Sequence, residues 1–170
     1  MFDTIAGLPL HPLVVHATEV IVPAAALVVL LAVLWPRFRR WAPYLPLGLS
    51  LAAVVLVPLS SESGDALEHR VGESGLIETH SQLADGLLPW VVALVVVAAA
   101  LVLWHRKDSW SRSYRDLAWI PVVLVVAGVL VSTGTTVQAV RVGHSGATAV
   151  WSGDVASSSS SSSGTDSDKD

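Results

Sequence analysis

Four long apolar stretches constrain this chain more than any other feature of its sequence. They cover about residues 13–35, 43–62, 86–104 and 117–139, and most charged residues lie between or beyond them. A helix needs ~20 mainly apolar residues to cross the ~30 Å hydrocarbon core of a bilayer. The sequence therefore predicts an all-α polytopic membrane protein in which four transmembrane helices form a bundle.

The composition agrees with a membrane protein and excludes several classes of function. Hydrophobic residues make up 52% of the chain and are gathered in blocks, whereas a soluble domain spreads them among polar positions. The absence of cysteine excludes disulfides, thiolate metal sites and covalently attached c-type haem. The sequence shows no nucleophile with its base, phosphate loop or nucleic-acid patch. We therefore expect neither an enzyme nor a nucleic-acid partner.

Basic residues are unevenly distributed over the connections, and this predicts the orientation. Seven of the ten Lys and Arg residues lie in the first and third connections, while the second carries only Arg70 among many acids. Connections rich in Lys and Arg stay in the cytoplasm. Both termini are therefore expected on the extracytoplasmic side of the bilayer. The seven residues are Arg37, Arg39, Arg40, Arg106, Lys107, Arg112 and Arg115.

The chain divides into a transmembrane domain, residues 1–152, and a tail, residues 153–170. The tail is a serine run followed by alternating acids, which cannot bury apolar surface, and it is expected to be disordered. The second connection, SSESGDALEHRVGESGLIETHSQLADG, places apolar residues at roughly helical spacing between glycines. It predicts short helices that extend the second and third spans on the extracytoplasmic side.

Five of the six histidines fall at the predicted extracytoplasmic ends of the spans. Imidazoles from different helices ligate metals and haem in many helix bundles. Histidine, which is both polar and aromatic, also suits any membrane interface. A purely interfacial role is therefore the alternative. The five are His11, His16, His69, His80 and His144, while His105 lies on the opposite side.

The first span begins with the segment LPLHPLVVHATEV, residues 8–20. Pro12 suits the first helical position, and Glu19 follows His16 by three residues, so these two side chains share a helix face. A carboxylate that accepts a hydrogen bond from an imidazole is the usual support of a metal-binding histidine. A hydrogen bond that merely satisfies two neighbouring polar groups is the alternative.

The segment TTVQAVRVGHSGATAVW follows the fourth span and brings a cation to the histidines. Arg141 lies three residues before His144, and its guanidinium could bind an anion or a haem propionate. In the alternative interpretation, both residues stabilise the C-terminal end of the helix by complementing its dipole.

The two halves of the chain share a spacing. His11 precedes Trp35 by the same interval as His80 precedes Trp104, and WPRFRRW and WHRKDSW both place tryptophans around a basic turn. Parallel repeats about an axis normal to the membrane occur in membrane proteins. The spacing predicts such a repeat, although any two helical hairpins that cross one bilayer have similar intervals.

The segments LPLHPLVVH, ETHSQLADG and VQAVRVGHSGA resemble the bacterial membrane family catalogued as domain of unknown function 2231. The resemblance covers about residues 7–151 and implies a four-helix protein of the bacterial plasma membrane. The late motif differs from the usual tyrosine, arginine, histidine, glycine form, because Val142 and Gly143 separate Arg141 from His144. The family has no assigned activity. By resemblance, the family-type histidines are His11, His16, His80 and His144.

Together these features predict a bundle that binds haem b or a transition-metal ion through an extracytoplasmic histidine cluster, with electron transfer as its function. Its expected centre is His16 and His80. The further ligands or neighbours are His11, His144, Glu19 and Arg141, with His69 as an additional candidate. A transport or proton-relay component and a structural, pH-sensing subunit are the alternatives. The lipid bilayer is the expected partner, and a homo-oligomer or a redox partner is compatible with each function.

Overall fold

The computed structural model describes residues 4–5, 8–71, 75–108 and 119–161. Four of its helices are long and apolar enough to cross a membrane, which confirms the predicted all-α polytopic bundle. A two-residue antiparallel strand pair precedes the first helix. The elements are β1 (Thr4–Ile5), β2 (Leu8–Pro9), α1 (Leu10–Leu34), α2 (Pro36–Trp41), α3 (Leu45–Val71), α4 (Gly75–Asp85), α5 (Leu88–Asp108) and α6 (Trp119–Ser161).

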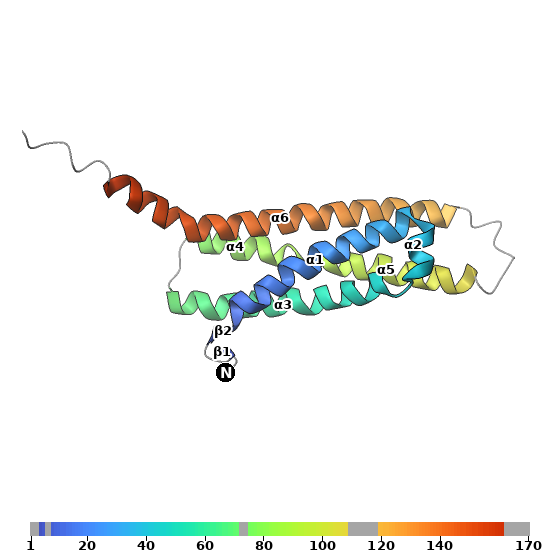
Figure 1. Cartoon of the computed structure of the whole chain (residues 1–170), viewed down its shortest axis with the longest axis horizontal. Helices are drawn as coiled ribbons and strands as arrows, with labels where there is room; N and C mark the ends of the chain where they lie inside the picture. The colour runs from blue at the N-terminus through green and yellow to red at the C-terminus, as the bar shows by residue number, and fades with distance from the viewer. Residues whose placement is uncertain (1–3, 6–7, 72–74, 109–118, 162–170) are drawn as a thin grey trace, which may run out of the picture.

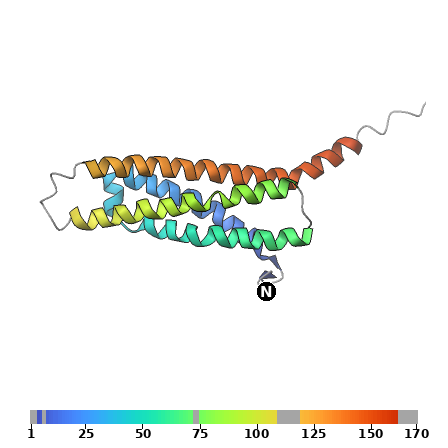
Figure 2. The ribbon, with the colours of Figure 1, turned by 180° about the vertical axis from the view of Figure 1, so that it is seen from behind.

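The long helices run up and down along one common direction (Figures 1 and 2). α1 packs mainly against α3 and α6, and α5 packs against the same two helices. α1 and α5 run in the same direction, as a parallel repeat requires. We call the end where α1 and α4 begin the histidine end, and the opposite end, which carries α2, the arginine end.

Small side chains let the helices approach one another. In α6, a Cβ added at Gly128 would lie 2.5 Å from Cγ1 of Val33 in α1, and one added at Gly134 would overlap the indole ring of Trp90 in α5. Membrane helices associate through close backbone packing, because lipid provides no hydrophobic drive between them. Alanines occupy many of the remaining contact positions. The fully buried ones include Ala25, Ala32, Ala53 and Ala98.

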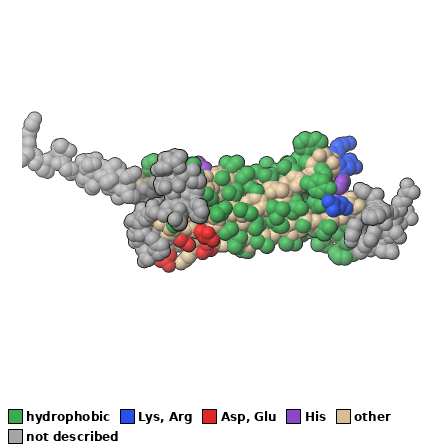
Figure 3. Space-filling view, turned by 90° about the horizontal axis from the view of Figure 1, so that it is seen from below, with side chains coloured by type: hydrophobic (Ala, Val, Ile, Leu, Met, Phe, Trp, Pro, Cys, Tyr) green, Lys and Arg blue, Asp and Glu red, His purple; other side chains and the backbone are tan. Residues whose placement is uncertain are grey.

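A band of hydrophobic side chains covers the middle of the bundle (Figure 3). In this view basic side chains gather at the arginine end and acidic ones at the histidine end. The short helix α2 adds aromatic rings, since Phe38 stacks on Trp35 with ring centroids 6.4 Å apart and lies 6.1 Å from Trp41. Amphipathic aromatic rings favour the membrane interface. The surface therefore has the pattern of a spanning bundle.

The short helix α4 agrees with the predicted helical extension of the third span, whereas the end of α6 differs from the expectation. The third apolar stretch is preceded by a separate helix, because the chain turns at Gly86 and Leu87 between α4 and α5. The fourth helix continues to Ser161, whereas residues from 153 on were expected to be disordered. Extending an existing helix costs far less than nucleating a new one, which explains how α6 runs on into a serine tract. Residues 162–170 lie outside the described part of the chain.

Candidate functional site

A contact of His11 connects the first and second spans, α1 and α3, at the histidine end. It lies in the first turn of α1, and its Nδ1 is 3.0 Å from Oγ of Ser63 in α3. The backbone carbonyl of Ser60 also lies beside the imidazole. A Cβ added at Gly64 would be 3.1 Å from Cε1 of His11, so the ring rests against a position where α3 has no side chain.

His80 makes the same contact in the second half of the chain. It lies in α4, and its Nδ1 is 2.9 Å from Oγ of Ser145 in α6. A Cβ added at Gly146 would be 3.1 Å from Cε1 of His80. Each imidazole thus meets a Ser-Gly pair on the helix that packs beside it. This correspondence of contacts supports the parallel repeat that the tryptophan spacing predicts.

The serine hydroxyls indicate which ring nitrogen carries the proton. Ser63 donates its single hydroxyl proton to the carbonyl of Ser60 at 2.9 Å, and Ser145 donates its own to the carbonyl of Val142 at 2.8 Å. Each Oγ is then left to accept, so Nδ1 of each histidine donates. The Nε2 atoms of the neutral rings therefore carry the lone pairs. The serine contacts of both rings are made by Nδ1 and not by Nε2.

The two rings belong to one local environment. Both are half-buried. They come from helices that start at the same end of the bundle, one in each half. With Nδ1 of each ring at a serine, Nε2 is the ring nitrogen that could bind a metal at the histidine end.

The structure places the expected partners His16 and Glu19 elsewhere. Both side chains are exposed on α1, and Nδ1 of His16 lies 2.6 Å from the backbone carbonyl of Pro12 in the preceding turn. This nitrogen therefore donates to its own helix and not to the carboxylate of Glu19. The predicted hydrogen-bonded pair is absent from the bonds of the described residues.

The remaining candidates lie around the two contacts. Arg141 and His144 are exposed on α6, and Arg141 precedes Ser145 by one helical turn. The side chain of His69 lies outside the described residues. His105 is near the arginine end, as expected. No three or more His, Asp or Glu side chains of the described residues gather as a metal site would require, so the expected four-histidine metal centre is not assembled there.

The serine and glycine partners were missed by the sequence reasoning. Ser63 and Gly64 lie 52 residues or more from His11, and Ser145 lies 65 residues from His80. The only sequence signal for these contacts is a Ser-Gly pair near the end of the second and of the fourth span. It is weak, because the same pair also occurs at residues 74–75, 152–153 and 163–164.

The interior of the described bundle contains few polar groups. Its buried polar side chains are four hydroxyls, and those of Thr18, Ser50 and Thr135 donate to carbonyls of their own helices. The hydroxyl of Ser132 has no partner among these residues. A transport or proton path needs a chain of polar groups across the membrane. The buried polar side chains of the described core form no such chain.

Comparison with known proteins agrees with this architecture. A family model described as predicted membrane protein, domain of unknown function 2231, matches residues 7–159. No curated protein and no solved structure matched the chain. The match covers both halves of the bundle and both histidine–serine contacts. The chain therefore belongs to the membrane-protein family of domain of unknown function 2231, and it is a multi-pass helical membrane protein.

Proposed function

We propose that the histidine end of this bundle binds a haem through His11 and His80, and that the protein transfers electrons at the membrane surface. The observation that carries the proposal is the matched pair of contacts, in which a serine on the neighbouring helix holds Nδ1 and leaves Nε2 available. A metal-binding imidazole almost always donates its other N–H to a protein group, which orients the ring. Ser63 and Ser145 have this orienting role.

The number of available ligands favours haem over a bare ion. A structural metal ion such as zinc takes four protein ligands, and the described residues gather no group of even three. Haem needs only one or two axial ligands from the protein, and imidazole is the commonest of them. Bound haem would supply one-electron chemistry. Arg141 lies one helical turn before Ser145, and it is the basic residue nearest in sequence to that serine. Its guanidinium would be the cation that binds a haem propionate.

The test is an ultraviolet-visible spectrum of the detergent-purified full chain, oxidised and reduced, with metal analysis of the same sample. The parent is expected to show haem bands and iron. His11→Ala and His80→Ala are each expected to lose them, because each removes one Nε2 ligand. His105→Ala, at the arginine end, is the matched control and is expected to keep them.

His16→Ala distinguishes this site from the one expected from the sequence. His16 is exposed and bonded to the carbonyl of Pro12, so its loss should leave the haem content unchanged. Loss of haem in His16→Ala would restore the site centred on His16 and His80. A parent without haem or metal, whose His11→Ala and His80→Ala variants melt at lower temperature, would show that the contacts only hold the helices together.

A further inference from the structure

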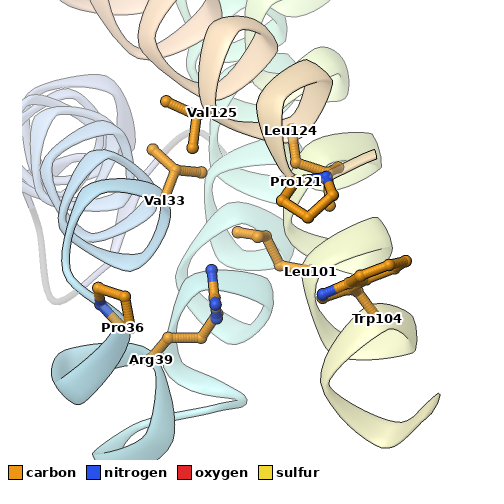
Figure 4. Close-up of a pocket in the computed structure, with 8 residues that line it drawn as sticks. All are labelled: Val33, Pro36, Arg39, Leu101, Trp104, Pro121, Leu124 and Val125. Atoms are coloured by element: carbon orange, nitrogen blue, oxygen red, sulfur yellow. The ribbon is translucent and has the colours of Figure 1, made fainter. Parts of the chain in front are cut away.

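A pocket at the arginine end lies where α1, α2, α5 and α6 meet (Figure 4). Its volume is about 150 Å³. A cavity of roughly this size can hold a benzene-sized group, so it has room for a phosphate group but not for a whole lipid. The lining residues are Val33, Pro36, Arg39, Leu101, Trp104, Pro121, Leu124 and Val125.

The lining side chains contain hydrogen-bond donors and no acceptor. Six of the eight are purely apolar, and the polar groups are the guanidinium of Arg39 and the indole N–H of Trp104. Both groups can only donate. A ligand that fits this chemistry is an anion joined to an apolar body.

Arg39 is held in place and retains capacity for a ligand. Its Nη1 donates to the carbonyl of Ala32 in the last turn of α1, at 3.3 Å. Figure 4 shows the side chain reaching from α2 into the space between Val33 and Leu101. Trp104 lies across the pocket from Arg39. The guanidinium has five N–H groups, of which this contact uses one. Its half-buried position distinguishes Arg39 from the exposed Arg37 and Arg40 on the same short helix.

We propose that this pocket binds the phosphate group of an anionic phospholipid, with Arg39 and Trp104 as its donors. The pocket lies beside the aromatic rings of α2, where the hydrophobic band ends. Phosphate groups of a bilayer lie at this level, and their acyl chains extend along the hydrophobic band. Basic pockets between transmembrane helices bind anionic headgroups. A zwitterionic lipid fits less well, because its own cation already neutralises the phosphate.

The test is native mass spectrometry of the full chain, purified in a non-ionic detergent and given equal amounts of phosphatidylglycerol and phosphatidylcholine. The parent is expected to retain phosphatidylglycerol preferentially. Arg39→Gln is expected to lower this retention about tenfold, the loss that corresponds to one charge-assisted hydrogen bond. Arg40→Gln, which removes the same charge from an exposed position of α2, should retain the lipid as the parent does.

Trp104→Phe provides a second variant that keeps an aromatic side chain and removes the N–H donor together with the five-membered part of the indole. It is expected to lower retention less than Arg39→Gln does, and it tests the site even if Arg39→Gln does not fold. Equal retention by Arg39→Gln and Arg40→Gln, or equal binding of both lipids by the parent, would refute the proposal. If inorganic phosphate alone raises the melting temperature as much as phosphatidylglycerol, the pocket binds small anions and the lipid proposal fails.

Discussion

His80 of α4 and Ser145 of α6 are joined by a 2.9 Å hydrogen bond across 65 residues of sequence. His11 and Ser63 form its counterpart in the first half of the chain. Each bond ties the helix that begins at the histidine end to the helix that ends there. The two bonds therefore tie α1 to α3 and α4 to α6 at this end.

Ser145→Ala is expected to lower the free energy of unfolding by about 1 kcal/mol, because Nδ1 of His80 loses its acceptor. Thermal unfolding in detergent measures the effect. Ser81→Ala is the control, since the Ser81 hydroxyl is exposed and bonds only to the carbonyl of Glu78 in its own helix. In a double-mutant cycle, Ser145→Ala should have little further effect in a His80→Ala background. Additive losses would contradict the contact.

Gly146→Ala is expected to displace the ring of His80, because the new methyl group would lie 3.1 Å from its Cε1. Gly143→Ala, three residues earlier in α6, meets nothing within 4 Å and should be neutral or slightly stabilising. The chemical shifts of a histidine labelled at the ring nitrogens report the displacement. Identical spectra for the two variants would show that His80 does not rest against Gly146.

Gly134→Ala is expected to be the most damaging of the glycine substitutions, at about 1–3 kcal/mol, because the added methyl group overlaps the indole of Trp90. Melting temperatures of Gly134→Ala and Gly48→Ala provide the comparison, since Gly48 has open space around it. Replacing Trp90 by leucine in the Gly134→Ala background should recover part of the loss. No recovery would mean that α6 and α5 are not in contact there.

Glu19→Gln is expected to leave the cofactor content unchanged. Both Glu19 and His16 are exposed, and the imidazole of His16 is bonded to the carbonyl of Pro12, so the carboxylate orients no ligand. Absorbance at the haem band, measured beside the melting temperature, checks this. A loss of ~10 to 100 fold in cofactor affinity would instead restore Glu19 as the support of a metal-binding His16.

The orientation in the membrane is a prediction from charge alone. With seven of ten basic residues in the first and third connections, both termini are expected on the extracytoplasmic side. A reporter active only in the cytoplasm should be silent when fused after Trp151 and active when inserted near Arg39. The reverse pattern would invert the bundle and place the histidine end in the cytoplasm.

The sequence by itself determined the properties that depend on local composition. Four apolar stretches of sufficient length predict four spans, because the hydrocarbon thickness sets the length of a spanning helix. The sequence also predicted that His11 and His80 lie at the same end of the bundle. Consecutive spans alternate in direction, and these two residues precede the first and the third span. Apolar residues at helical spacing between glycines in the second connection predicted the helical extensions that the end of α3 and the short helix α4 form.

The tertiary structure decided which side chains meet. Helix periodicity placed His16 and Glu19 on one face, but only packing shows that this face points outward while His11 points toward α3. The rotation of each helix depends on where small residues allow close approach, such as Gly128 against Val33. Contacts across 52 and 65 residues follow from that rotation. No local pattern encodes them, because lipid-facing and protein-facing positions of these helices are equally apolar.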